Sequence, residues 1–365
     1  MVTGQDDSGP AAASEPAAAH GADAASGGES AAGGSGVAIA SQVAAVGETG
    51  AVSGGAAADG EPAVEAGATV GDEYAADGEP AAVVAFWRDL GLSGLVDVHT
   101  HFMPPNVLDK VWNYFERGRE AGQAWPVVYR RPEQERVALL RAFGVRRFGA
   151  LAYPHKPGMA EWLNSWAAEF AARTPDALHS ATFYAEPGAG VYVAGAIGAG
   201  ARLFKAHLQV GGYDPRNELL DPVWGLLAEA RVPVIVHCGS GPTPGRYTGP
   251  GPISEVLARH PELIMIVAHL GAPEYGEFFD LMQRHAGVYL DTTMAFTGFF
   301  ERLMPFPAAL RPRLAEAADR ILLGSDFPNI PYPYLHQLEA LARLDLGVRW
   351  LRAVCHDNAA RLLGL

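Results

Sequence analysis

The motif DVHTHF at residues 97–102 completes an apolar run, GLVDVH, that begins at Gly94. Short apolar runs bounded by glycine are typical of buried β-strands. His99 and His101 are two residues apart, and alternate side chains of an extended segment lie on the same face. The motif therefore predicts that a single strand brings two imidazoles to one place.

Seven further strand-like runs follow this one. They lie at residues 147–153, 180–185, 201–207, 233–237, 263–269, 288–292 and 320–326. Stretches with a helical period of 3.6 residues separate most of them, for example residues 161–172 and 221–230. Strands that alternate with helices indicate a parallel sheet, and eight such units predict an α/β fold, a closed (β/α)₈ TIM barrel. A doubly wound sheet would more often have five or six strands and a glycine-rich first turn.

The N-terminal part of the 365-residue chain has a different composition. Residues 1–84 are mostly Ala, Gly, Ser and acids, which cannot bury enough apolar area to offset their chain entropy. We therefore expect a disordered low-complexity extension over residues 1–84 and the barrel over residues 85–365. Thirteen of the 41 acidic residues precede Arg88, the first basic residue, and the remaining 28 nearly balance the 27 basic residues.

Composition also limits the partners. A nearly neutral folded part disfavours nucleic acid, whose phosphates need a basic surface. Cys238 and Cys355 follow no pairing pattern, so a reducing compartment is expected. Neither a secretion signal nor an apolar run of about 18 residues is present, which predicts a cytoplasmic protein that does not bind membranes. The expected partner is a small-molecule substrate, and a homodimer is left open.

Polar residues end five of the eight predicted strands. In a TIM barrel the carboxyl ends of the strands converge on one mouth, where the chemistry is carried out. Two histidines separated by one residue are common by themselves, but together with two further potential ligands on other strands they indicate a metal site. The residues at these strand ends are Asp97, His99, His101, Lys205, His207, His237, His269 and Asp326.

These motifs resemble those of the amidohydrolase superfamily, in the amidohydrolase-2 branch that includes aminocarboxymuconate-semialdehyde decarboxylase. The resemblance runs from about Gly94 to the closing NAARLLGL at residues 358–365. It implies that one divalent metal, usually zinc, is bound by the ligand set His99, His101, His237 and Asp326. It also implies that His269, in AHLGAP, is a catalytic residue beside the metal.

Two further positions bear on this resemblance. Many superfamily members carry, on the fourth strand, a carboxylated lysine that bridges two metals. Lys205 lies there in the context FKAH, which resembles the branch with one metal. Relatives often read GSDYPH after the last strand, whereas this chain has GSDFPN, with Asn329 at the end. This departure leaves the ligand set intact but changes the residues around the substrate.

Three imidazoles and one carboxylate suit zinc, and also manganese, iron or cobalt. Asp326 is the expected general base, and His269 would hydrogen-bond the water or polarise the substrate carbonyl. Hydrolysis of an amide, ester or lactone ranks first, non-oxidative decarboxylation second, and an inactive barrel that serves as a binding module third. The predicted substrate-binding residues are Lys205, His207 and Arg246, the last as a cation for a carboxylate.

Overall fold

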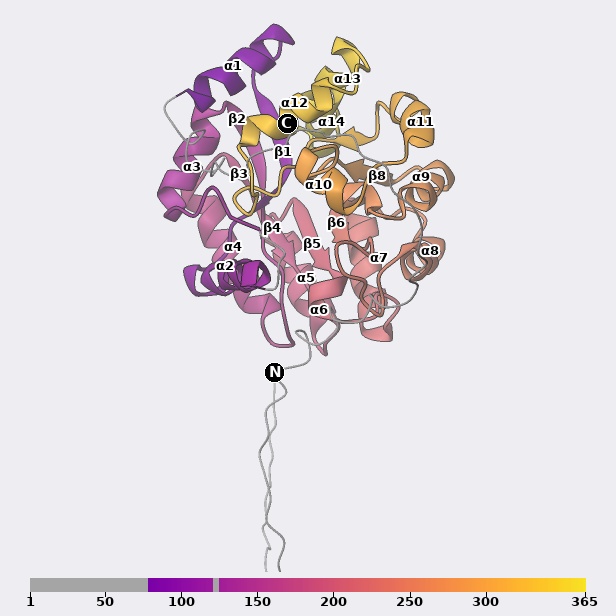
Figure 1. Ribbon diagram of the computed structural model, residues 1–365. Helices are drawn as coiled ribbons and strands as arrows, with labels where there is room; N and C mark the ends of the chain where they lie inside the picture. The colour runs from indigo at the N-terminus through magenta and orange to yellow at the C-terminus, as the bar shows by residue number, and fades with distance from the viewer. Residues whose placement is uncertain (1–77, 121–124) are drawn as a thin grey trace, which may run out of the picture. The chain divides into compact units, whose positions relative to one another are not determined.

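The computed structural model describes residues 78–120 and 125–365 (Figure 1). The expected disordered extension, as far as residue 77, lies outside the described residues. Helix α1, Glu79–Asp89, begins inside that predicted extension, so residues 79–84 are part of a helix. The Glu79 carboxylate accepts hydrogen bonds from the Tyr129 hydroxyl at 2.7 Å and from the Leu335 amide at 3.2 Å. Composition cannot reveal contacts with partners so distant in the sequence.

Parallel strands form the centre of the fold. Their order is β1-β2-β3 in one sheet and β4 to β9 in sequence in the other, and every pairing is parallel. The strands are β1 Leu95–His101, β2 Val145–Leu151, β3 Ala177–Leu178, β4 Ser180–Thr182, β5 Leu203–His207, β6 Val234–His237, β7 Met265–Val267, β8 Val288–Asp291 and β9 Ile321–Leu322.

Hydrogen bonds between the first and last strands close the barrel. The Val98 amide donates to the Leu323 carbonyl and the Asp326 amide to the His99 carbonyl, both at 2.9 Å. Only His179 separates β3 from β4, so these two segments together make the third of eight barrel strands. The predicted (β/α)₈ barrel is therefore confirmed.

Helices surround these strands (Figure 1). The predicted helical stretches 161–172 and 221–230 are confirmed by α4 and α7. The helices after α1 are α2 Pro105–Glu120, α3 Glu133–Ala142, α4 Ala160–Arg173, α5 Ala189–Gly198, α6 Leu208–Gly211, α7 Asp221–Ala230, α8 Pro250–Arg259, α9 Tyr275–Arg284, α10 Gly298–Leu303, α11 Arg311–Glu316, α12 Tyr334–Ala342, α13 Val348–Arg352 and α14 Asn358–Leu363. Shorter helical segments are η1 Glu218–Leu220, η2 Ala268–Gly271, η3 Ala308–Leu310 and the π-helical η4 Ala353–Asp357.

Apolar side chains fill the barrel interior and the layer between strands and helices. The interior cluster includes Val98, Leu203, Ile235 and Ile266, one from each of four strands, all essentially inaccessible. The buried histidines His99, His101, His207, His237 and His269 lie at or just after the carboxyl ends of the strands, where a TIM barrel carries out its chemistry. Within the described ranges, no helix combines the length and the apolarity needed to cross a bilayer.

Candidate metal centre

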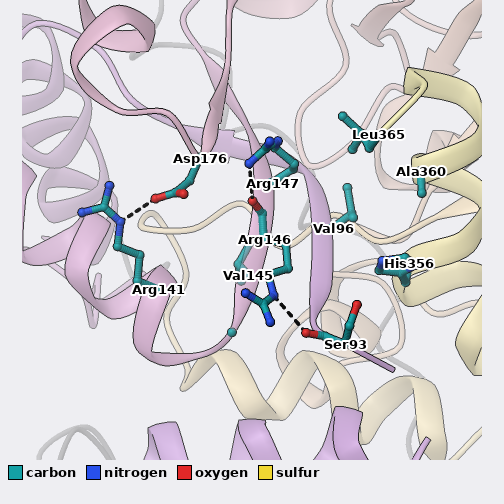
Figure 2. Close-up of a pocket in the computed structure, with 11 residues that line it drawn as sticks. Ser93, Val96, Arg141, Val145, Arg146, Arg147, Asp176, His356, Ala360 and Leu365 are labelled. Atoms are coloured by element: carbon teal, nitrogen blue, oxygen red, sulfur yellow. Dashed lines mark hydrogen bonds and ion pairs between the residues drawn. The ribbon is translucent and has the colours of Figure 1, made fainter. Parts of the chain in front are cut away.

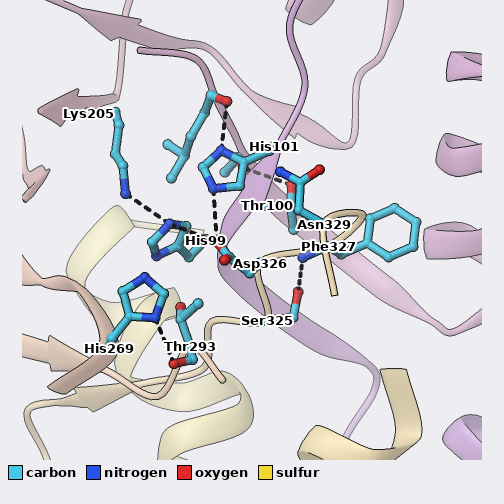
Figure 3. Close-up of polar contacts among 12 residues, drawn as sticks. His99, Thr100, His101, Lys205, His269, Thr293, Ser325, Asp326, Phe327 and Asn329 are labelled. Carbon is cyan, nitrogen blue, oxygen red and sulfur yellow. Dashed lines mark hydrogen bonds and ion pairs between the residues drawn. The ribbon is translucent and has the colours of Figure 1, made fainter. Parts of the chain in front are cut away.

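The first strand carries both imidazoles to one carboxylate, as the spacing predicts. Strand β1 continues to His101, two residues beyond the predicted strand end. The Nε2 atoms of His99 and His101 lie 3.4 Å and 2.9 Å from Oδ1 of Asp326 (Figure 3). Both rings are almost wholly buried, so these contacts form in a medium that screens charge weakly.

Three histidine rings are held by their other nitrogen. Nδ1 of His99 lies 2.9 Å from Oδ2 of Asp291, that of His101 lies 3.2 Å from the Leu151 carbonyl, and that of His269 lies 3.1 Å from the Thr293 carbonyl. Carbonyl and carboxylate oxygens only accept hydrogen bonds, so in His99 and His269 the proton is on Nδ1 and the lone pair is on Nε2, whereas Nε2 of His101 donates to Oδ1 of Asp326. Metal-binding histidines are commonly oriented in this way.

Asp326 and His269 both have strained backbone conformations. Asp326 has φ 72° and His269 has φ 55°, in the left-handed region that non-glycine residues rarely adopt. This backbone ends the strands early: β7 stops at Val267 and β9 at Leu322, short of the predicted 269 and 326. The His269 amide donates to Oδ1 of Asp291 at 2.9 Å, which helps to hold the left-handed turn.

Gly324 allows the last strand to approach the first. A Cβ at this position would lie 2.1 Å from Oγ1 of Thr293 and 2.9 Å from Cβ of His99. Both distances are far below van der Waals contact, so no other residue fits without moving the backbone. Glycine is therefore required for the bend that brings Asp326 to the histidines.

The donor atoms fit a divalent cation. One ligand atom each from His99, His269 and Asp326 lies within 4.8 Å of the others, and His101 contacts the same Asp326 oxygen. Neutral imidazole nitrogens and a carboxylate oxygen are the ligands that zinc and similar ions take. Because these atoms already lie close to one another, the residues could hold one metal.

His237 lies beside this group. Its Nε2 lies 3.1 Å from the Gly241 carbonyl, to which it donates, and its free lone pair is therefore on Nδ1. The ring centroid is 4.8 Å from that of His269 and 4.1 Å from that of His207, with which it stacks at 10°. His237 is outside the group whose ligand atoms are all within 4.8 Å, so its role as a ligand stays a prediction.

The three predicted substrate-binding residues lie in three different environments. Lys205 is fully buried and its Nζ donates to Nε2 of His99 at 2.9 Å. The Val210 amide donates to Nδ1 of His207 at 3.3 Å, so the proton of this ring is on Nε2, which can donate. Arg246 is exposed and its guanidinium lies 5.2 Å from the centroid of the Tyr247 ring, so its role in substrate binding stays a prediction.

Burial determines most of the pKa values at this centre. It lowers the pKa of His99 to about 3, with the Lys205 charge acting in the same direction, and it lowers that of Lys205 to about 8. Burial by itself would raise the pKa of Asp326, but the hydrogen bond from His101 and the neighbouring imidazoles lower it below the usual range. A neutral imidazole and an ionised carboxylate are the forms that bind metal.

Asp97 lies in β1, two residues before His99, and is fully buried. Burial raises its pKa to about 7 against the hydrogen bonds that it accepts. Those donors are the Ser325 hydroxyl at 2.6 Å, the Tyr334 hydroxyl at 2.9 Å and the His99 amide at 3.1 Å. Asp97 thereby links both ends of the closed barrel directly below the ligand residues.

Asp291 was not predicted from the sequence to belong to the site, although its carboxylate contacts His99 and His269. It ends β8, the seventh barrel strand, in the run VYLDT, and the rule applied to the other strand ends would have included it. Its Oδ2 faces His99, while Oδ1 accepts from the amides of His269 and Thr293. The His99 imidazole lowers the pKa of Asp291 below its usual range, against the opposing effect of burial.

Asn329 is fixed by two tryptophans of the long connection between β1 and β2. Nε1 of Trp112 donates to Oδ1 of Asn329 at 3.0 Å, and Nε1 of Trp125 donates to its carbonyl at 2.7 Å. The side chain therefore has a structural use in the segment that follows Asp326. The departure from GSDYPH is matched by indole donors that the sequence alone could not assign.

Comparisons with known proteins agree with this geometry. A family model described as Amidohydrolase matches residues 96–365. Similar solved structures include an uncharacterised TIM-barrel protein of Bordetella bronchiseptica, with 20% identity, 74% of this chain and 99% of that chain covered, and a TM-score of 0.58. A 5-carboxyvanillate decarboxylase of Sphingomonas paucimobilis has 12% identity, 75% and 100% coverage, and a TM-score of 0.51.

A 5-carboxyvanillate decarboxylase of Novosphingobium aromaticivorans, solved with manganese, has 16% identity, 75% and 99% coverage, and a TM-score of 0.51. No curated protein matches the chain. At these identities the solved structures support the fold, while the family model covers nearly all of the barrel. The chain belongs to the amidohydrolase-2 family and is a metal-dependent hydrolase or carboxy-lyase.

Proposed function

We propose that this enzyme hydrolyses an amide, ester or lactone of a small organic molecule. In this proposal one divalent ion, zinc before manganese, iron or cobalt, is held by His99, His101, His237 and Asp326. The observation that carries the proposal is the set of three Nδ1 tethers, on His99, His101 and His269, which hold the three rings around the Asp326 carboxylate. A site for a metal and a water needs this combination of neutral nitrogens and a nearby base.

The protein groups divide the remaining chemistry. When bound, the metal would act as a Lewis acid that lowers the pKa of a water from 15.7 to about 7. One oxygen of Asp326 contacts the histidines, and its second oxygen would accept the proton of the attacking water and return it to the leaving amine or alkoxide as the carbonyl bond to that group breaks. His269 has its proton on Nδ1, so its Nε2 accepts a hydrogen bond from that water and orients it. This tautomer favours water orientation over polarisation of the carbonyl.

The substrate would contact the wall beside these groups. Nε2 of His207 carries a proton and can donate to a carbonyl or carboxylate oxygen. The Tyr153 ring packs against His207 at 4.8 Å and against His101 at 5.4 Å, measured between centroids. We place His207 and Lys205 in the substrate-binding wall and leave out Arg246, since it is exposed on its loop. The cytoplasmic location and a homodimer stay predictions.

Decarboxylation is the second candidate, and one residue favours it. Lys205 is a fully buried cation beside His99, where it could pair with the carboxylate that leaves as carbon dioxide. Two of the solved structures with this fold are 5-carboxyvanillate decarboxylases. The third reading, an inactive barrel, is disfavoured because three separately tethered rings would have no purpose in a binding module.

Oxygen labelling separates the two reactions. The metal-loaded enzyme would be incubated anaerobically in H₂¹⁸O with a panel of lactones, amides, esters and unsaturated or aromatic acids. Hydrolysis places one ¹⁸O atom in the product carboxylate, as mass spectrometry detects, and releases no carbon dioxide. Release of carbon dioxide without ¹⁸O in the organic product would replace the proposal by decarboxylation, and no turnover of any class would count against both.

A carboxylate variant makes the test specific. Asp326→Asn removes the base and one negative ligand, so turnover should fall by at least about 100-fold, the usual range for a general base. Asp280→Asn is the matched control, because this aspartate is half exposed and pairs with Arg313 away from the mouth. Equal turnover in both variants would show that Asp326 is not the base.

A further inference from the structure

A second cavity lies at the opposite end of the barrel from the histidines. It has a volume of about 480 Å³ and is lined at the amino ends of β1 and β2 by Ser93, Val96 and Val145, and by His356 and Ala360 from the C-terminal helices (Figure 2). The ligand residues lie at the other ends of these strands. Small-molecule pockets commonly measure about 300–1,000 Å³, so this cavity is large enough for a metabolite.

Three arginines give the cavity its charge. Arg141, Arg146 and Arg147 line it together with Asp176 and Leu365, whose terminal carboxylate is a second acidic group. Arg141 is paired with Asp176 (Figure 2). Within the part of the chain that the structure describes, Arg146 and Arg147 make no ion pair with a carboxylate. The barrel residues are nearly neutral in sum, so two guanidinium groups in one cavity without an ion-pair partner are a local feature.

A β-bulge directs both of these arginines to the same cavity. Consecutive residues of a regular strand point to opposite faces. Leu95 pairs with Val145, but the next residue, Val96, pairs with Arg147, so Arg146 is an extra residue in β2. Bulges of this kind change the direction of a side chain and are retained where that direction is used.

Main-chain carbonyls hold the two guanidinium groups in place. Nε of Arg146 donates to the Ser93 carbonyl at 2.9 Å, and Nη1 of Arg147 donates to the Arg146 carbonyl at 3.1 Å. Gly94 makes room for the first contact, because a Cβ there would lie 2.6 Å from Cγ of Arg146. Each guanidinium has five N–H donors, so several remain available after these bonds.

We infer that this cavity binds a small phosphorylated molecule, of the size of a sugar phosphate, at a site separate from the metal centre. Two positioned guanidinium groups provide the paired N–H donors that match phosphate oxygens, and a doubly charged anion compensates both. The remaining space, walled by Val96, Val145 and Ala360, accommodates the uncharged part of the molecule. This site does not depend on which reaction the mouth catalyses.

Calorimetric titration tests the inference. The probe is ribose 5-phosphate, with ribose as the uncharged comparison, and the protein is the full chain as purified. Arg146→Met combined with Arg147→Met removes both charges and keeps the aliphatic stems, so the affinity for ribose 5-phosphate should fall at least tenfold. Ribose should bind neither protein, and the parent's affinity should decrease as salt is added, as expected for an ionic contact.

Two controls keep the result interpretable. Arg259→Met removes an equally exposed arginine from α8, and it should bind the probe as the parent does. An unchanged melting temperature of the double variant would show that it is folded. Equal affinity in the parent and the double variant would overturn the inference, because the phosphate would then bind elsewhere, for example at the metal centre. Absence of binding by the parent below about 10 mM probe, which corresponds to a binding free energy of about 3 kcal/mol, would overturn it as well.

Discussion

The two ends of the barrel hold charged groups in opposite ways. At the mouth, Asp291 is buried and the Asp326 side chain is only 13% exposed, and each contacts several partners, so a change in one group disturbs others. At the base, Arg146 and Arg147 are exposed and each is held by one carbonyl. Buried hydrogen-bonded charges are costly to leave unpaired, whereas exposed ones are screened by water. Substitutions should therefore have large, coupled effects at the mouth and small, independent ones elsewhere.

Removal of a ligand should have the largest effect. His99→Ala deletes an imidazole whose Nε2 faces Asp326 and whose Nδ1 pairs with Asp291. Protein purified without chelators should contain about one equivalent of metal in the parent and nearly none in this variant, as measured by plasma mass spectrometry. His285→Ala, at the end of α9, is the control and should keep its metal. A parent without metal would contradict the centre as a whole.

The same measurement of metal content tests whether His237 is a ligand. The ligand set predicted from the sequence contains His237, whereas His269 belongs to the group with ligand atoms within 4.8 Å. If His237 is a ligand, His237→Ala should lose metal as His99→Ala does. Metal loss in His269→Ala with full occupancy in His237→Ala would exchange the two roles.

Asp291 tests whether positioning groups matter as much as direct ligands. Asp291→Asn keeps the shape but removes the charge that holds Nδ1–H of His99, so metal affinity should fall by about 10- to 100-fold. Competition with a fluorescent chelator measures this affinity. The amide oxygen of the substituted side chain can still accept from the His269 amide, so the fold should be kept, as circular dichroism would show. Unchanged affinity would mean that the ring is oriented without Asp291.

Sequence reasoning worked well where the residues act through period and position. The apolar runs indicated all eight barrel strands, and the spacing of His99 and His101 predicted their shared face. It failed where long-range contacts decide the outcome. Nothing local in the sequence indicates that Glu79 is fixed by Tyr129, or that His269 and Asp326 adopt a left-handed backbone. These features depend on partners that meet only in the folded chain.

Gly324 should show an intermediate effect that is steric in origin. Gly324→Ala forces a Cβ to within 2.1 Å of Oγ1 of Thr293, so the backbone must shift and the free energy of unfolding should fall by about 1–3 kcal/mol. Gly251→Ala is the control, since no atom lies within 4 Å of its added Cβ, and in helix α8 alanine is favoured over glycine. Urea titration of both variants checks the difference. Equal midpoints would show that the mouth yields to the extra methyl group.

The smallest effect is expected outside the mouth, at Glu79. Burial raises the pKa of this carboxyl above its usual value of 4.5 in the folded state. The folded protein then binds a proton more tightly than the unfolded chain, so this contribution to stability is complete below pH 4.5 and is lost as the pH rises through the folded-state pKa. Glu79→Gln removes the titration, and the free energy of unfolding should decrease less from pH 4.5 to neutral pH than in the parent.

Tyr129→Phe should change the same slope in the opposite direction. The Tyr129 hydroxyl donates to Glu79 at 2.7 Å and opposes the rise in the Glu79 pKa, so its loss raises that pKa further. Urea titrations at several pH values should therefore give a steeper decrease for Tyr129→Phe and a shallower one for Glu79→Gln. If both variants kept the parent's slope, Glu79 would be ionised with the same ease in the folded and unfolded chains. The ionisation state of Glu79 would then make no difference to the stability of the folded chain.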